Sequence, residues 1–495
     1  MNRRVIVIGS GAAGSALAHR LTSTARTSVL VLEAGPDVRP DVVRTPARWP
    51  ETLGGEFDFG YRTVPQAGLG GRVIDYHRGR LLGGTTCINA MIHALPRASD
   101  LDTWGAGWSA EDVGEAMRAL ENHSAGGAHR GVDGPAVNGT VARPHEMCAA
   151  FIDACVEAGH KRIDDMNNSQ ENGAGWLDLS IDQDGNRVDA ASAYLRDYLD
   201  RPNLEVRSNA SVKRLVLRDG SVVAIQIRTA GGSEEELLVG DAEVVLCCGS
   251  IDSPALLLRS GIGPADDLQE VGVPVLLDLA GVGANLHDHP LLPVVWSVDR
   301  PLGPPAAQMF ESQLVLRDES AAGAHLAIGF GHIPFLPPGS PAPEHGATAL
   351  IGLYGPRSRG SLRLDPAAPQ DAPLIDPGFL SDDRDVAALK KGIDIVRTIA
   401  KQNAVHAFGL QEIVPGAGVD DVDGFVRQAT GSFFHPVGTC ALGDGPAAVV
   451  DRDLVVRGAT NLRVADASVI PRIPAVATSA TAQLIGWRLA ELMEA

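Results

Sequence analysis

Three glycines and one acidic residue near the N-terminus have the spacing of a site for an adenine dinucleotide. Gly9 permits a tight turn, Gly11 lets a pyrophosphate approach backbone N–H groups, and Gly14 lets a helix pack closely on a strand. Glu33 follows Gly14 by 19 residues, where a carboxylate accepts hydrogen bonds from an adenosine ribose and disfavours a 2′-phosphate. The spacing predicts dinucleotide binding, with a purely structural turn as the alternative. It does not decide between FAD and NAD.

The residues around these glycines predict the strand–helix–strand unit that such a site requires. Residues 5–8 form a short apolar run, which suits a strand buried on both faces of a parallel sheet. Apolar residues between 13 and 21 recur at helical spacing, and residues 29–32 form a second apolar run that ends at Glu33. The glycines therefore lie where a strand turns into a helix.

Two later segments predict that the dinucleotide-binding domain is discontinuous. Residues 203–229 alternate between apolar and polar side chains around Asp219-Gly220, which predicts an antiparallel hairpin. Residues 243–248 form another buried type of strand, and a helical stretch follows at 253–260. A simple repeat of alternating strands and helices is thereby excluded.

The remaining segments predict a second lobe and two long helices. Residues 290–346 contain many proline turns, so we expect mainly loops there, in part of a substrate lobe. Residues 382–402 and 481–493 have helical spacing.

Composition excludes several classes of protein. A chain of 495 residues with 44% hydrophobic and 21% charged residues is a folded protein of two or more domains. Its net charge of −19 disfavours nucleic acid and anionic membranes as partners. No apolar run reaches the ~18 residues of a membrane span. The six cysteines lack a repeated spacing, which argues against a disulfide framework or a metal site. Residues 1–4 leave no room for a signal peptide, so we expect a cytoplasmic protein.

Several ordered segments resemble the glucose-methanol-choline (GMC) oxidoreductases. Residues 79–91 and 249–263 resemble the two signatures of that family, although His93 and Leu95-Pro96 stand where many members have an aromatic residue and an Arg-Gly pair. Further matches lie at 281–290, 358–361, 435–440 and 461–471. The resemblance implies a small bacterial-type alcohol oxidase or dehydrogenase that uses FAD rather than free NAD.

The same resemblance implies an α/β (α+β) fold in which a Rossmann-like, glutathione-reductase-type FAD domain lies beside a mixed-sheet substrate-binding domain. We expect residues 1–150, 203–290 and 431–495 to belong to the FAD domain. Residues 151–202 and 291–430 then belong to the substrate domain.

The resemblance also implies which residues bind the cofactor. They are expected along the glycine turn, the first signature, the hairpin and the C-terminal segment: Gly9, Gly11, Ala12, Ala13, Gly14, Glu33, Ala34, Leu82, Gly83, Gly84, Thr85, Asn89, Ala90, Met91, Ile92, Val212, Asp466, Ala467 and Thr478. A helix cap is the alternative role for Asp466. Some members attach the flavin through a histidine at the position of Ile88, so we predict noncovalent FAD.

His435 matches the position of the family's catalytic base, and histidine suits proton transfer near neutral pH. The family commonly places an Asn or His about forty residues later, where this chain has Ser479. A serine hydroxyl cannot act as a second imidazole and reaches less far than an amide. His435 then works almost alone, or the substrate or the chemistry differs from ordinary alcohol oxidation.

His287-Asp288-His289 resembles a metal cluster only superficially. Adjacent residues of an extended chain point to opposite faces, and no third ligand is suggested. The segment fits a family motif that we expect to pack near the flavin.

The predicted partners are a small-molecule alcohol, with a specialised metabolite as one option, and oxygen or another electron acceptor. Two alternatives stay open: a redox-neutral lyase of the same family, and a flavin-binding protein without catalysis. The sequence does not decide whether the aromatic residues of the substrate lobe belong to the core or to the wall of a pocket: Trp296, Phe310, Phe330, Phe335 and Phe434. Choline is disfavoured because no aromatic cluster suggests a cage for a cation.

Overall fold

The computed structural model describes residues 3–127, 129–168, 171–305, 307–317, 325–337, 339–340 and 342–494. Its first sheet has five parallel strands in the order β23-β12-β1-β2-β8. These strands are β1 (Arg3–Ile8), β2 (Thr27–Leu32), β8 (Leu204–Arg207), β12 (Glu243–Leu246) and β23 (Leu462–Val464). Segments from both ends of the chain thus share one sheet, which confirms that this domain is discontinuous.

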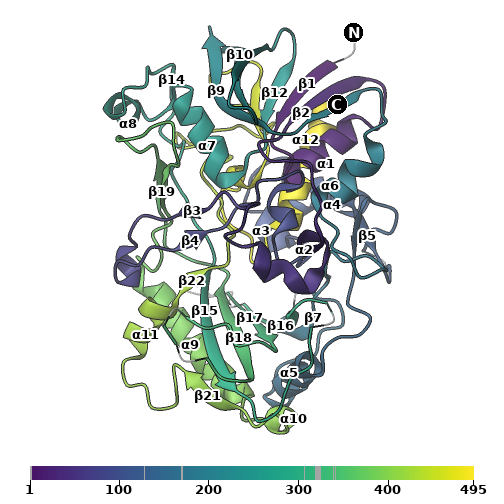
Figure 1. Cartoon of the computed structure of the whole chain (residues 1–495), viewed down its shortest axis with the longest axis vertical. Helices are drawn as coiled ribbons and strands as arrows, with labels where there is room; N and C mark the ends of the chain where they lie inside the picture. The colour runs from purple at the N-terminus through teal and green to yellow at the C-terminus, as the bar shows by residue number, and fades with distance from the viewer. Residues whose placement is uncertain are drawn as a thin grey trace.

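Helices α1 (Ala12–Leu21) and α12 (Ser479–Glu494) pack against each other beside this sheet, in the upper half of Figure 1. Their approach is close enough that a Cβ at Gly486 would lie 2.0 Å from the Ala13 carbonyl oxygen. The predicted C-terminal helix is therefore confirmed. It brings the last residues of the chain onto the helix that follows the first glycine turn.

The predicted hairpin is also confirmed. Strands β9 (Ala210–Arg218) and β10 (Ser221–Thr229) pair antiparallel, with Asp219 and Gly220 both at positive φ in the turn, and β11 (Glu234–Leu238) adds a third strand. Helix α7 (Gly249–Arg259) follows β12 as predicted and packs against β9.

The second sheet lies in the lower half of Figure 1 and runs in the order β21-β15-β18-β17-β16-β7. Its strands are β7 (Gly173–Trp176), β15 (Pro290–Ser297), β16 (Phe310–Leu316), β17 (Leu326–Gly331), β18 (Gly346–Leu353) and β21 (Gln411–Val414), with β22 (Gly431–Ser432) beside β15. The strands of this sheet pair antiparallel, and an isolated parallel bridge joins Arg162 to Ala174 of β7. The predicted α/β (α+β) fold, with a parallel-sheet domain beside a second sheet domain, is confirmed.

The expectation of mainly loops at 290–346 misses three strands, β15, β16 and β17, which lie there between irregular segments. These strands are buried along almost their whole length. Strands covered on both faces lack the period of two that marks a half-exposed strand. In β16 the buried residues even include three consecutive polar ones, Glu311 to Gln313, so no apolar run marks that strand. Because proline is typical of turns, the prolines around these strands led to the prediction of loops.

Helices α5 (Glu146–Glu157) and α9 (Asp383–Ile399) pack on the second sheet, and α10 (Asn403–His406) packs on α5. The predicted helix at 382–402 is thereby confirmed. The division of the chain at residues 150, 202, 290 and 430 stays a proposal.

The remaining elements are short and surround the two sheets. They are α2 (Asp41–Arg44), η1 (Pro46–Thr52), β3 (Tyr61–Arg62), η2 (Ala67–Leu69), β4 (Asp75–Tyr76), η3 (Gly84–Cys87), α3 (Ala98–Leu101), α4 (Ala110–Leu120), β5 (Glu121–His123), β6 (Ala136–Asn138), α6 (Ala190–Tyr194), η4 (Arg196–Tyr198), β13 (Ile262–Gly263), α8 (Ala265–Glu270), β14 (Leu277–Asp278), β19 (Ser361–Arg363), β20 (Leu374–Asp376), α11 (Val422–Ala429) and η5 (Ala467–Val469). Within the described ranges, no helix is long and apolar enough to cross a membrane.

Candidate active site

A cavity of about 450 Å³ connects the two sheets. Gly9 and Glu33, at the ends of β1 and β2, line one end of it. Leu291 and Leu350, from β15 and β18, line the other end. One elongated site therefore reaches from the glycine turn to the floor formed by the antiparallel sheet.

The glycine turn has the geometry that the spacing predicts. Gly9 has a φ of 100°, and a Cβ there would lie 2.5 Å from the Cys247 carbonyl oxygen. A Cβ at Gly14 would lie 2.0 Å from the Gly9 carbonyl oxygen. At Gly11, by contrast, a Cβ would meet nothing within 4 Å. Gly9 and Gly14 are thus needed for packing, whereas Gly11 keeps the cavity open at the N-terminus of α1, where N–H groups attract a phosphate.

Glu33 lies at the end of β2 and is 5% exposed. Its carboxylate accepts hydrogen bonds from the Ser10 N–H (3.0 Å), the Ser10 hydroxyl (2.6 Å) and the Gly35 N–H (2.8 Å). Burial raises the pKa of Glu33, while these donors counteract the shift. A carboxylate has room for about four hydrogen bonds, so it can still accept one from a ribose.

Most of the predicted cofactor residues do line this cavity. Those in contact with it are Gly9, Gly11, Ala12, Ala13, Glu33, Ala34, Gly84, Thr85, Asn89, Ala90, Met91, Ile92, Val212, Asp466, Ala467 and Thr478. Gly14, Leu82 and Gly83 do not line it: Leu82 is fully buried, and Gly83 donates its N–H to the Ser10 hydroxyl at 3.2 Å. These three residues lie behind the residues that line the cavity.

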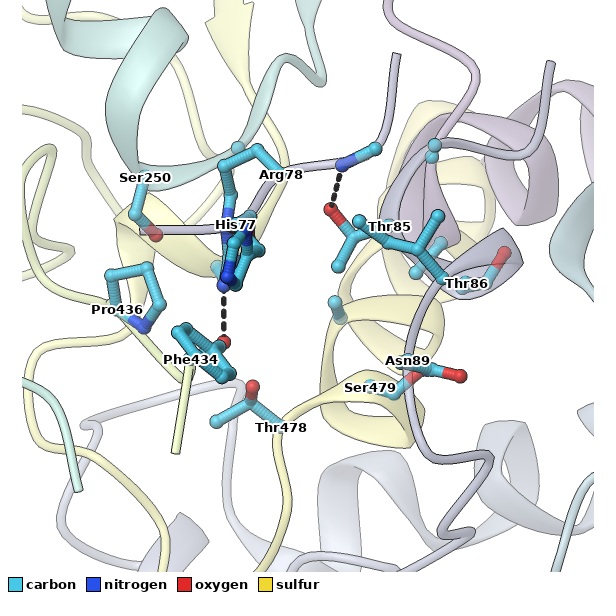
Figure 2. A pocket seen from close by; sticks show the side chains of 18 of the residues that line it. His77, Arg78, Thr85, Thr86, Asn89, Ser250, Phe434, Pro436, Thr478 and Ser479 are labelled. Atoms are coloured by element: carbon cyan, nitrogen blue, oxygen red, sulfur yellow. Dashed lines mark hydrogen bonds between the residues drawn. The ribbon is translucent and has the colours of Figure 1, made fainter. Parts of the chain in front are cut away.

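The cavity also holds features that a bound FAD would satisfy. The Ser250 hydroxyl is buried on the cavity wall without a hydrogen-bond partner among the described residues. Figure 2 shows Ser250, Arg78 and Pro436 on one side of the opening, with Thr85, Thr86 and Asn89 on the other. Polar groups on facing walls and a glycine turn at one end of the cavity together fit an extended dinucleotide.

Asp466 serves as a cap and lines the cavity as well. It accepts hydrogen bonds from the Ser468 N–H (2.8 Å), the Ser253 hydroxyl (2.6 Å) and the Gly249 N–H (2.8 Å). The alternative role as a helix cap is therefore present in the structure. Its side chain ties the start of η5 to the start of α7, which places Ala467 on the cavity wall.

His435 lies on the same wall and pairs with a second histidine. The Nδ1 atoms of His435 and His289 are 3.0 Å apart, and the two rings meet edge to face. Two Nδ1 atoms at that distance share one proton, so one ring donates and the other accepts. Burial and the nearby Arg78 charge lower the pKa of His435 to about 3, and burial lowers that of His289 well below its ordinary range. Both rings are neutral near neutral pH.

Asp288 holds the turn that presents His435. Its carboxylate accepts hydrogen bonds from the His435 N–H (2.8 Å), the Ser432 hydroxyl (2.5 Å) and the Tyr76 hydroxyl (2.6 Å). Between Ser432 and His435, Phe434 has a φ of 62°, a left-handed conformation that is uncommon for a bulky residue. The Phe434 N–H donates to the Ser432 hydroxyl at 2.6 Å, so the same network closes around this residue.

The metal alternative for residues 287–289 finds no support. His287 Nδ1 lies 2.6 Å from the Asn285 carbonyl oxygen, and its Nε2 accepts from the Ile473 N–H at 3.0 Å. His287 thus fastens two loops together, while His289 faces His435. Across the described ranges, no group of three His, Cys, Asp or Glu could hold a metal ion.

Ser479 lines the cavity at the first position of α12. Within the described part of the chain, no hydrogen bond joins it to His435. The imidazole partner of His435 is therefore His289, a residue that the sequence places only in a packing segment. The family-like triplet Asp288-His289-Pro290 is the sequence feature that could have drawn attention to His289. Its contact with His435 joins residues 146 positions apart, so the sequence does not reveal the pairing.

Sequence reasoning also missed a cluster beside Phe434. His77 lines the cavity, contacts the Phe434 ring with centroids 5.0 Å apart, and places its Nδ1 2.5 Å from Asp58. The His77 hydrogen bond and three backbone N–H groups lower the pKa of Asp58, despite burial. Arg78 donates to the Phe434 carbonyl oxygen, as Figure 2 shows. No motif marks these residues, because their partners come from distant segments.

Comparisons with known proteins agree with this geometry. Two family models, both described as GMC oxidoreductase, match residues 4–291 and 356–486. The chain is 35% identical to an oxygen-dependent choline dehydrogenase of Brucella anthropi, over 96% of this chain and 92% of that one. It is 34% identical to a mitochondrial choline dehydrogenase of Homo sapiens, over 99% and 89% of the two chains. A pyridoxine 4-oxidase from Mesorbium loti has a TM-score of 0.92 and 33% identity, and 99% of each chain is covered.

Proposed function

The chain belongs to the GMC oxidoreductases, FAD-dependent enzymes that act on CH–OH groups, and we propose that His435 is the base of its reaction. The observation that carries the proposal is the His435–His289 pair, 3.0 Å apart on the wall of a cavity that begins at the glycine turn. The similar proteins are dehydrogenases and an oxidase, so the lyase alternative receives no support.

The histidine pair determines which nitrogen of His435 can act. If His435 Nδ1–H donates to His289 Nδ1, the lone pair of His435 Nε2 is free to accept the hydroxyl proton of an alcohol. If His289 donates instead, His435 carries its proton on Nε2 and cannot act as a base there. The His289 Nε2 atom is buried and makes no hydrogen bond to the described residues, but the nearby Pro474 carbonyl opposes the lowering of the His289 pKa and so favours a proton on this ring. We infer that His289 is protonated on Nε2 and accepts through Nδ1.

Other features of the site support this reaction. The Asp288 network fixes the direction of His435 through the backbone. His289 is fully buried, whereas His435 is half-buried and faces the cavity. The predicted cofactor residues hold FAD, which accepts the hydride from the alcohol carbon when it is bound. Ser479 lies close enough to the cavity to contact a substrate, and we retain it as a binding residue rather than as a base.

The electron acceptor and the mode of flavin attachment complete the proposal. One similar protein is called oxygen-dependent and another is called an oxidase, which supports oxygen as the acceptor here. The residue at the attachment position, Ile88, is an alkyl side chain that cannot bond to a flavin. Oxygen uptake during turnover, and release of all flavin on denaturation, are the expected results.

Anaerobic mixing of the holoenzyme with a panel of primary and secondary alcohols tests the function. Substrate should bleach the absorbance of the oxidised flavin. His435→Ala should slow bleaching on the order of 10²-fold or more, while the flavin content stays equal to that of wild type. His406→Ala changes an exposed histidine and is the matched control. An unchanged rate of flavin reduction in His435→Ala would show that His435 is not the base.

A further inference from the structure

We propose that the floor of the antiparallel sheet selects an uncharged alcohol with an aromatic or branched apolar body, with Gln313 and Gly329 as the residues that set this specificity. The inference rests on the proposed function, because it concerns the substrate of the same site. It differs from what the names of the choline dehydrogenases would suggest.

The floor is built from one face of four neighbouring strands. Leu291 of β15, Phe310 and Gln313 of β16, Gly329 of β17 and Leu350 of β18 all line the cavity. Leu291, Phe310 and Leu350 pack in one apolar cluster with Trp49, Phe335 and Phe433 around them. A substrate body that reaches this floor therefore meets rings and alkyl groups on several sides.

This apolar floor lies next to the histidine pair. Tyr354 stacks on His289 with ring centroids 4.2 Å apart, and its ring lies 6.4 Å from that of His435. Phe433 stacks on His435 with ring centroids 5.6 Å apart. Tyr354 in turn lies beside Gln313: burial raises the pKa of Tyr354 to about 12, and the Gln313 amide opposes that shift. The amide of Gln313 is thus separated from the base by one aromatic residue.

Carboxylates are present in the cavity but not on this floor. The three that line it are Glu33, Asp252 and Asp466, which follow β2, lie in α7, and follow β23. Each already has protein donors: Glu33 and Asp466 have those given above, and Asp252 accepts from the Tyr61 hydroxyl at 2.7 Å. All three belong to the glycine-turn side of the cavity.

The charged side chain that lines the cavity beside the base is positive. Asp288 also lies next to His435, but it is outside the cavity lining, and its carboxylate is occupied by the hydrogen bonds from Tyr76, Ser432 and the His435 N–H. Arg78 donates to the Phe434 carbonyl oxygen and lines the cavity. A buried cation needs a counter-charge, and contact with aromatic faces alone compensates only part of its lost hydration. A quaternary ammonium group at the floor would therefore be placed among apolar groups near a guanidinium, with no carboxylate from the described residues to pair with it.

Gln313 gives the floor a single site for polar recognition. Among the described residues from β15 to β18 that line the cavity, it is the one with a polar side chain. An amide both donates and accepts, so it can bind a hydroxyl, carbonyl or ring nitrogen at the far end of a substrate. It cannot neutralise a cation.

Gly329 gives the floor its depth. A Cβ there would lie 3.7 Å from Phe310 Cδ1 and 3.9 Å from the Ser312 carbonyl oxygen, which are ordinary contacts. A larger side chain is therefore compatible with the strand and would extend into the cavity. Gly331 on the same strand is different, because a Cβ there would lie 2.4 Å from the Phe310 ring. We infer that Gly329 is a size filter that can be changed without rebuilding the sheet.

The charge is tested with two alcohols of the same shape, choline and 3,3-dimethyl-1-butanol, in anaerobic flavin reduction by the holoenzyme. We expect kcat/KM for the neutral alcohol to be at least about tenfold higher. Gln313→Glu places a carboxylate on the floor and should raise the choline-to-neutral ratio about tenfold or more. Gln313→Leu, which removes the amide without adding charge, should not raise that ratio.

Binding gives a second measurement that does not depend on turnover. Calorimetric titration with tetramethylammonium should detect binding to Gln313→Glu and none to wild type at the same concentrations. Gly329→Val should lower kcat/KM for benzyl alcohol relative to ethanol about tenfold, and Gly329→Ala should lie between Val and wild type.

The outcomes separate the two proposals. If no alcohol reduces the flavin of the wild-type holoenzyme, the proposed function fails and this inference fails with it. If alcohols do reduce the flavin but choline is used as well as its neutral analogue, the proposed function stands and the specificity inference is overturned. The specificity inference is also overturned if Gln313→Glu binds FAD normally but leaves both the ratio and the tetramethylammonium titration unchanged.

Discussion

At the parallel sheet, the cavity is walled by backbone and by carboxylates already engaged with protein donors, whereas at the antiparallel sheet it is walled by apolar side chains and one amide. At the first end, steric limits are strict: the hypothetical Cβ atoms of Gly9 and Gly14 collide with backbone oxygens. At the second end, a Cβ at Gly329 fits. The cofactor end is therefore intolerant of change, and the substrate end is open to it.

The largest effect should follow a change at the intolerant end. Gly14→Val forces a side chain toward the Gly9 carbonyl oxygen, 2.0 Å from the Cβ position, and should lower the free energy of unfolding by about 3 kcal/mol or more. Denaturant unfolding and flavin content measure it. Gly11→Ala is the matched control, because its Cβ meets nothing within 4 Å. It should keep the fold and weaken only FAD binding. Equal loss of stability in both variants would contradict the distinction.

His289→Leu should have the next largest effect, on rate rather than on folding. Leu cannot accept the proton of His435 Nδ1–H, so the tautomer that exposes His435 Nε2 is no longer favoured. We expect the rate of flavin reduction to fall on the order of 10²-fold. His289→Asn keeps an acceptor near the position of Nδ1 and should retain more activity. If Leu and Asn reduce the rate equally, the tautomer argument is wrong.

Asp288→Ala should have a smaller effect that divides between stability and rate. It leaves the hydroxyls of Tyr76 and Ser432 and the His435 N–H without their acceptor. The expected loss is about 2 kcal/mol in the free energy of unfolding, with a roughly tenfold lower kcat. Asp288→Asn preserves an acceptor for the His435 N–H and should recover kcat. Recovery of stability without recovery of kcat would show that the charge itself matters.

The smallest effect concerns pH. Because burial and Arg78 lower the pKa of His435 from 6.5 to about 3, the neutral base persists as the pH falls. The acid limb of kcat/KM should therefore lie well below pH 6.5. Arg78→Met removes the positive charge and should move that limb upward, by about one pH unit or less, whereas Arg78→Lys should not. A wild-type limb at the ordinary histidine value would contradict the shift.

The contrast between the two ends also explains what the sequence could predict. The glycine turn, Glu33 and the strand–helix–strand unit around them lie within 33 residues, so local spacing specifies them. The hairpin at 210–229 and helices α9 and α12 have equally local signals. The parallel sheet and its discontinuity were likewise predictable from short apolar runs.

The substrate end could not be predicted in the same way. The strands β15, β16 and β17 lack the alternation that reveals a half-exposed strand, and prolines between them suggest loops. The His435–His289 contact and the Asp288–Tyr76 bond join residues 146 and 212 positions apart. Pairings of this kind depend on how the sheets meet, and a single sequence carries no local record of that.

The conformation of Phe434 has a consequence for how the protein could be stabilised. A bulky residue held at φ 62° costs the folded state on the order of 1 to 3 kcal/mol, and glycine would adopt that conformation without the cost. Phe434→Gly should remove that strain, but it also removes the ring contact with His77 and adds conformational entropy to the unfolded chain, so heat resistance should not improve. The variant should hold His435 less firmly and lose part of the enzyme's rate.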